Sequence, residues 1–283
     1  MSAVRTQAER LLAEATGILE AAGVESARHD AESLLSHVTG IPRMSLVTRA
    51  RPDGIQKDAF LKLIEARASR IPLQHLTGSA AFRYVDLEVG PGVFVPRPET
   101  EMLAGWAIDH AKTLTDPVVV ELCAGSGAIS LSVVHEVPSA RVHAVELDEP
   151  AYEWAQRNLD GTGVDLRLGD MADAFSDLDG TVDIVVANPP YIPLDAWESV
   201  APEVRDHDPS LALWSGDDGL DAMRVLEQTA WRLLKPGGVV GAEHADAQGE
   251  SAPEVFVPRW TSVRDNLDLA RRPRFVTATK PAN

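Results

Sequence analysis

The sequence of 283 residues predicts an α/β fold in which a small helical bundle precedes a mostly parallel sheet with helices on both faces. Before residue 70, apolar residues recur at helical spacing. From Pro117 onward, short apolar runs alternate with helical stretches, which is typical of parallel strands joined by crossover helices. We therefore expect a helical domain over residues 1–76, a β-hairpin linker over 77–100 and an α/β domain over 101–283.

The helical domain is indicated by three apolar sets separated by turn-forming residues. Turns are expected at Gly23, at Gly40-Ile41-Pro42 and at Pro52-Asp53-Gly54. The pattern i, i+3, i+4, i+7 is followed by Leu11, Leu12, Ala15, Ile18, Leu19 and Ala22, then by Ala31, Leu34, Leu35 and Val38, and a further apolar face is formed by Phe60, Leu61, Leu63 and Ile64. The pattern fits either a partner-binding module or a cap on the larger domain.

Between Pro72 and Pro98 the residue pattern changes from helical spacing to strand-like alternation. Alternating apolar residues precede Gly90-Pro91-Gly92, and Val93-Phe94-Val95 follows it, so we expect two short strands around that turn. A helix is expected to begin near Glu101.

The sheet is predicted from six strand-like runs after Pro117. Their expected ranges are 118–122, 142–146, 164–168, 182–187, 239–243 and 274–278.

The first of these strands leads directly into a turn of small residues that opens a helix. Glycine in such a turn lets a ligand approach the backbone closely. The turn lacks a complete G-x-G-x-x-G spacing because Ser130 stands at its last position, and no Lys or Arg is available there for a pyrophosphate. A nucleoside with an amino-acid tail, S-adenosylmethionine, fits better than a dinucleotide. The residues expected to bind it here are Glu121, Cys123, Ala124, Gly125, Ser126 and Gly127.

Acidic residues follow the next two strands. Glu146 ends the second strand, where its carboxylate can accept hydrogen bonds from both ribose hydroxyls. Asp170 follows the third, positioned to receive an adenine amino group, and Met171 can pack on the ring. Open α/β sheets bind ligands at the carboxyl ends of their strands, which favours one shared site.

The fourth strand closes with Asn188-Pro189-Pro190-Tyr191. Two prolines fix φ and remove two backbone donors, so mostly acceptors remain. The Asn188 side-chain oxygen and the Pro189 carbonyl can accept the two hydrogens of a planar NH2 group, and Tyr191 can pack on it. We predict Asn188, Pro189 and Tyr191 as catalytic, with Asn188 also near the cofactor and Pro190 at the substrate.

Composition excludes several classes. The net charge is −17, and residues 1–76 carry 10 Lys and Arg against 9 Asp and Glu, so the remainder carries 16 against 34. Such a charge repels nucleic acid. Cys123 is the only cysteine, which excludes intrachain disulfides and thiolate zinc sites. No apolar run of membrane-spanning length or signal-peptide layout appears, so we expect a cytoplasmic monomer without a metal.

Several blocks together resemble the release factor glutamine methyltransferases, the HemK/PrmC family, over nearly the whole chain. They are Arg70 to Gly78, the Pro-Arg-Pro-Glu-Thr loop at Gly92 to Glu101, Gly125 to Ile129, Ala155 to Asn158, Asn188 to Ile192, and Glu243-His244. The resemblance implies a class I, Rossmann-like methyltransferase fold with a seven-stranded sheet and an N-terminal substrate-recognition domain. It implies methylation of the glutamine side-chain nitrogen (N5) in the Gly-Gly-Gln motif of release factors, and Arg97 and Glu99 as further substrate contacts, unless these two form an ion pair.

The chain departs from the family pattern at the glycine-rich turn, where Cys123 replaces a glycine, and at Glu146, Ala245 and Arg271. If the Arg271 site needs a positive φ, the arginine adds strain there. Two alternatives stay open from the residues alone: an adenine-N6 or guanine-N2 nucleic-acid methyltransferase, and a scaffold that keeps the fold without catalysis.

Overall fold

The computed structural model describes residues 6–282, which form two compact units. The first contains the helices up to Ser79 together with residues 201–207, and the second contains residues 80–200 and the chain from Asp208 onward. The sequence places residues 201–207 in the α/β domain, whereas the structure packs them with the helices. This segment follows the Asn188 loop by only ten or so residues.

The helical unit is a bundle around one apolar core. Two of its helices begin with a capping box: Thr6 and Glu9 form the first, and Asp53 and Gln56 form the second. Leu12, Leu34 and Phe60 are fully buried in its core. The elements are α1 (Gln7–Ala21), α2 (Ala27–Thr39), η1 (Arg43–Ser45), α3 (Leu46–Arg49), α4 (Gly54–Ala68), α5 (Leu73–Thr77) and α9 (Pro202–His207).

The hairpin differs from the prediction. Its strands are β1 (Ser79–Phe82) and β2 (Val85–Glu88), and Arg83 makes the turn with a φ of 51°. Residues 93–95 are not a strand. The glycines after β2 serve close packing instead of a hairpin turn, because a Cβ at Gly90 would lie 2.6 Å from the Trp154 ring.

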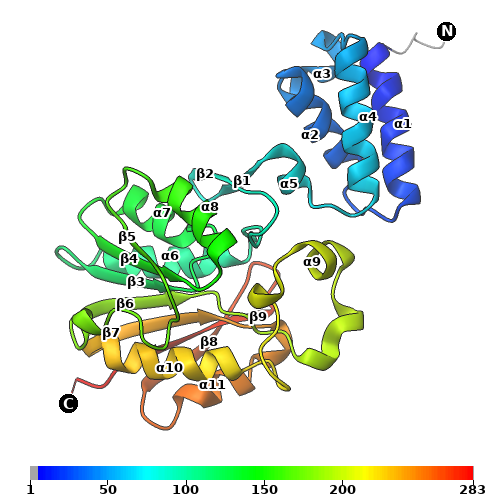
Figure 1. Ribbon diagram of the computed structural model, residues 1–283. Helices are drawn as coiled ribbons and strands as arrows, with labels where there is room; N and C mark the ends of the chain where they lie inside the picture. The colour runs from blue at the N-terminus through cyan, green and yellow to red at the C-terminus, as the bar shows by residue number, and fades with distance from the viewer. Residues whose placement is uncertain (1–5, 283) are drawn as a thin grey trace. The chain divides into compact units, whose positions relative to one another are not determined.

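The second unit is built on a seven-stranded sheet in the order β5-β4-β3-β6-β7-β9-β8 (Figure 1). The first five strands in this order are parallel, and β9 pairs antiparallel with β7 and β8. The predicted mostly parallel sheet is therefore confirmed. The strands are β3 (Val118–Leu122), β4 (Arg141–Glu146), β5 (Asp165–Leu168), β6 (Val182–Ala187), β7 (Leu234–Glu243), β8 (Thr261–Leu267) and β9 (Pro273–Thr279).

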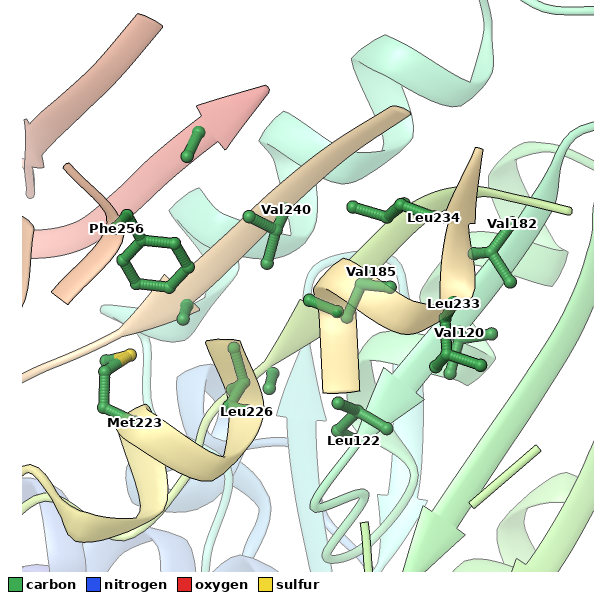
Figure 2. Packing of buried hydrophobic residues seen from close by; sticks show 14 of the residues in the cluster. Val120, Leu122, Val182, Val185, Met223, Leu226, Leu233, Leu234, Val240 and Phe256 are labelled. Carbon is green, nitrogen blue, oxygen red and sulfur yellow. The ribbon is translucent and has the colours of Figure 1, made fainter. Parts of the chain in front are cut away.

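Helices cover both faces of this sheet, as the alternation of strands and helices predicts. On one face Val185 packs with Leu226 of α10 and Phe256 of α11, and Figure 2 shows this cluster. Its neighbours Ile184 and Val186 pack on the other face with α6, α7 and α8. The helices are α6 (Thr100–Ala111), α7 (Ala128–Glu136), α8 (Glu149–Leu159), α10 (Asp221–Leu233) and α11 (Ser251–Phe256), with short 3-10 turns η2 (Ser176–Leu178), η3 (Leu194–Ser199), η4 (Ser210–Ala212) and η5 (Asp246–Gln248).

Two strand assignments need correction. β7 begins at Leu234, five residues earlier than expected, and the pairing register shifts where its glycines lie against β6. β8 is a strand that the sequence did not predict, because it is an edge strand in which no residue is buried. In residues 6–282, no helix is both long and apolar enough to cross a membrane.

Candidate functional site

The turn after β3 forms one side of the site. Cys123 has a φ of 59° and Gly127 a φ of 80°, so the chain makes a tight left-handed path before α7 begins at Ala128. A Cβ placed on Gly125 would meet nothing within 4 Å, which leaves its backbone open to a ligand. Among the small residues predicted for cofactor binding, Gly125 therefore presents accessible backbone at the carboxyl end of the sheet. Ala124, Ser126 and Gly127 are themselves buried.

Glu121, on β3, fixes the far end of this turn through hydrogen bonds to Ser130 in α7. Its carboxylate accepts a hydrogen bond from the Ser130 backbone nitrogen (2.8 Å) and a short one from the Ser130 hydroxyl. The side chain is almost completely buried, and this burial raises its pKa to about 8. Its contacts lie at the first turn of α7, so Glu121 acts on the shape of the turn.

Glu146, at the end of β4, faces the same turn. Its Oε2 accepts from the Gly125 nitrogen at 2.7 Å, and its Oε1 accepts from the Asp148 nitrogen at 2.8 Å. A carboxylate offers about four lone-pair directions, so each oxygen keeps an acceptor position for a diol. Burial raises the pKa of Glu146, while backbone hydrogen bonds from Asp148, Gly125 and Leu147 oppose that shift.

Asp170 and Met171 follow β5. Asp170 is exposed and accepts from the Ala172 nitrogen at 2.9 Å. The Met171 sulfur lies 3.7 Å from the Cys123 sulfur, which links the ends of β3 and β5. The Cys123 thiol is held neutral, because burial and the nearby carboxylates raise its pKa.

The Asn188-Pro189-Pro190-Tyr191 segment lies at the end of β6, as predicted. Asn188 donates through Nδ2 to the Thr100 hydroxyl at 3.2 Å, and no described residue donates to its Oδ1. The Tyr191 hydroxyl donates to Glu243 at 3.3 Å, and the Tyr191 carbonyl accepts from Gln248 Nε2 at 3.1 Å.

The backbone after this segment is also held. Ile192 pairs with Leu213 and with Ser215 through backbone hydrogen bonds of 2.8 and 2.9 Å. Pro189 is buried, whereas Asn188, Pro190 and Tyr191 are partly accessible. The segment therefore presents a fixed acceptor face.

Arg97 does not pair with Glu99. Its guanidinium donates to Asp208 at 2.7 Å and lies over the Phe94 ring, 4.8 Å from the ring centroid. Glu99 is exposed. The ion pair considered from the sequence is thus made with a residue 111 positions away.

Three residues of the site were not predicted as such: Thr100, Glu243 and Gln248. Thr100 begins α6 and Glu243 ends β7, both within blocks that carry the family resemblance. A carboxylate at the last residue of a parallel strand is the same signal that identified Glu146, and it would have indicated Glu243. The neighbouring His244 is buried and contacts Asp265 at 3.1 Å.

The chain is similar to known proteins over nearly its whole length. A family model described as the PrmC N-terminal domain matches residues 10–78, and one described as a methyltransferase small domain matches residues 100–200. The release factor glutamine methyltransferase of Streptomyces coelicolor is 56% identical over 273 residues, covering 95% of this chain and 96% of that protein. That of Mycolicibacterium smegmatis is 46% identical over 286 residues, covering 100% and 99%.

One relative bears a different name. The 4-amino-L-phenylalanine/4-methylamino-L-phenylalanine methyltransferase of Streptomyces pristinaespiralis is 42% identical over 270 residues, covering 92% of this chain and 91% of that protein. Most of the strongest matches nevertheless share the first name, and the resemblance predicted from the sequence blocks is confirmed. The chain belongs to the release factor glutamine methyltransferase family.

Proposed function

We propose that this protein transfers a methyl group from S-adenosylmethionine to the side-chain nitrogen of the glutamine in the Gly-Gly-Gln motif of peptide chain release factors. The observation that carries the proposal is the Asn188 side chain, whose nitrogen is engaged by Thr100 and whose oxygen is open. A planar amide has two hydrogens on its nitrogen, and this end of β6 offers acceptors for both.

The residues at the ends of β3, β4 and β5 fit S-adenosylmethionine. The open backbone at Gly125 and the remaining lone pairs of Glu146 suit the ribose, Asp170 suits the adenine amino group, and Met171 suits the face of the ring. When bound, this cofactor supplies a methyl group already activated by its sulfonium. The carboxylates nearby suit its positive charge.

The chain's own contribution is orientation. An amide nitrogen is a weak nucleophile because its lone pair is delocalised into the carbonyl. Hydrogen bonds from the amide to Asn188 Oδ1 and to the Pro189 carbonyl hold the nitrogen in one direction, and Tyr191 packs on the glutamine side chain. Such positioning accounts for a large share of catalysis in other systems, at about 10⁵–10⁸ M effective molarity. The extra proton on the methylated nitrogen then passes to water.

The helical unit would recognise the release factor. Its match to a family model described as the PrmC N-terminal domain supports this role over that of a cap. Destabilising this unit should then raise the KM for the release factor and leave the KM for S-adenosylmethionine unchanged.

The deciding experiment incubates the protein with methyl-labelled S-adenosylmethionine and a release factor, or with the same factor carrying Gln→Ala in its Gly-Gly-Gln motif. Label should enter only the unaltered factor, and label in both would contradict the assigned atom. Asn188→Ala should abolish nearly all turnover while calorimetry still detects cofactor binding, since Asn188 acts mainly on the amide. Undiminished methylation by this variant would refute its role.

Parallel incubations address the alternatives. 4-Amino-L-phenylalanine tests the activity for which one relative is named, and DNA or ribosomal RNA tests a nucleic-acid amine. Preferential labelling of any of these over the release factor would overturn the proposed substrate. Failure to bind S-adenosylmethionine would favour a scaffold.

A further inference from the structure

Three side chains from distant parts of the sequence meet beside Asn188. Thr100 is the first residue of α6, Glu243 is the last residue of β7, and Tyr191 follows β6. The strand pairing explains the meeting: Ala187 lies opposite Ala242 in the parallel pair β6·β7, so Asn188 and Glu243 come next at the same edge.

The contacts form a chain with a fixed direction. Tyr191 donates its hydroxyl hydrogen to Glu243 Oε1 at 3.3 Å, and the neighbouring Thr100 hydroxyl lowers the pKa of this carboxyl group, which burial raises. An ionised carboxylate only accepts, so the Thr100 hydroxyl stabilises the ionised form by turning its hydrogen toward Glu243. The lone pairs of the Thr100 oxygen are then left for Asn188, which donates through Nδ2 at 3.2 Å.

This direction decides which way the Asn188 amide faces. The two ends of an asparagine side chain have nearly the same shape and differ only in donating or accepting. If the amide were turned over, its oxygen would face an oxygen whose hydrogen is already committed to Glu243. The ionised Glu243 therefore selects the orientation in which Asn188 Oδ1 is open.

Glu243 is an unfavourable residue for stability alone. It is 1% exposed, and its Oε2 is buried without a partner of good hydrogen-bond geometry. A buried carboxylate with incomplete hydrogen bonding is destabilising, and a neutral side chain of similar size would fill the space without that penalty. Arg274 on β9 compensates part of the charge.

We infer that Thr100 and Glu243 are positioning residues, which hold the Asn188 amide with Oδ1 facing the substrate nitrogen. The inference rests on the proposed function, because it assigns the orientation of the amide clamp. Neither side chain needs to touch the substrate. Their removal should reduce turnover by letting the asparagine rotate, and should leave cofactor affinity unchanged.

The test compares Thr100→Val with Thr100→Ser in the full-length protein. Valine keeps the shape of threonine and removes the hydroxyl, whereas serine keeps the hydroxyl and removes the methyl group. We expect Thr100→Val to lower kcat for the release factor by about 10²-fold, the scale of a misplaced reacting group. The KM for S-adenosylmethionine should not change, and Thr100→Ser should recover most of kcat.

The possible results distinguish a positioning role from packing and from failure of the proposed function. Wild-type kcat in Thr100→Val, or an equal loss in Thr100→Ser, would overturn the positioning role, the second because it would indicate packing alone. Glu243→Gln gives a second, independent measurement if Thr100→Val unfolds: it keeps the size but can donate as well as accept, so it should lower kcat while retaining cofactor binding. If the wild-type protein itself leaves the release factor unmethylated, the proposed function fails instead.

Discussion

Gly219 packs against the backbone of Tyr191. Its substitution by alanine tests how tightly that backbone is held. Gly219 has a φ of 75°, and a Cβ there would lie well inside contact distance of the Tyr191 carbonyl oxygen and 2.6 Å from Gln248 Nε2. Gln248 cannot simply move aside, because the same nitrogen donates to the carbonyls of Tyr191 and Asp218 at 3.1 and 3.2 Å.

The magnitude has two parts. Any L-residue at this φ is disfavoured by about 1–2 kcal/mol. The added methyl group also needs the Tyr191 carbonyl to move by about 1 Å to reach ordinary contact. A displacement of that size near a reacting group reduces rates by about 10²-fold. We therefore expect Gly219→Ala to lower both stability and kcat.

Gly180 provides the matched control. Its φ is 70°, yet a Cβ there would meet nothing within 4 Å. Gly180→Ala should show the backbone penalty alone, measured by denaturant unfolding, with kcat for the release factor at the wild-type value. Equal kcat in the two variants would refute the idea that the clash with Tyr191 matters, and a loss of cofactor binding in Gly219→Ala would place the effect elsewhere.

Two further predictions concern charge. Arg67→Met should destabilise the helical unit by about 3 kcal/mol, because it removes the arginine paired at 2.8 Å with the buried Asp30 carboxylate, whereas Glu203 keeps its pair with Arg70 at 2.6 Å. It should raise the KM for the release factor and leave the KM for S-adenosylmethionine unchanged. Thermal unfolding and kinetics should find the exposed Arg49→Met variant unchanged. Burial raises the pKa of Glu243 to about 7, so kcat should rise with pH through that value as the carboxylate forms. Because the folded state holds this proton more tightly than the unfolded state, the contribution of Glu243 to the free energy of unfolding falls as the pH rises from about 4.5 to about 7. A pH profile of Glu243→Gln that keeps this limb would assign it to another group; those facing Glu243 are Thr100, Tyr191, Arg274 and Glu99.

The sequence predicted the central strands well because their signal is local. β6 is a run of six buried residues followed by Asn188 and two prolines, and both of its ends were predicted correctly. β8 was missed because its hydrogen bonds to β9 define it, and an edge strand need not show a buried face. The turn at Arg83 was missed since an arginine at positive φ has no sequence signal.

The site likewise contains residues that local patterns predict and long-range contacts that they do not. Asn188, Glu146 and Asp170 each follow a strand, and parallel strands bring their ends together. The partners of these residues come from far along the chain: Thr100 lies 88 positions before Asn188, and Asp208 lies 111 positions after Arg97. Such contacts depend on how loops and helices close over the sheet, which local patterns do not encode. Two departures from the family pattern also could not be interpreted from local sequence. Cys123 and Arg271 both adopt a positive φ, a backbone conformation that usually favours glycine.

The amide clamp by itself does not select glutamine. Asn188 Oδ1 and the Pro189 carbonyl read only a planar nitrogen with two hydrogens, a feature that a glutamine amide shares with an aromatic amine. Discrimination between such substrates must therefore come from groups that contact the rest of the molecule. The helical unit is the part of the chain matched by a family model described as the PrmC N-terminal domain, which makes it the better place to look for that selectivity. A variant that raises the KM for a release factor while sparing the KM for a small aromatic amine would separate capture of the protein from recognition of the nitrogen.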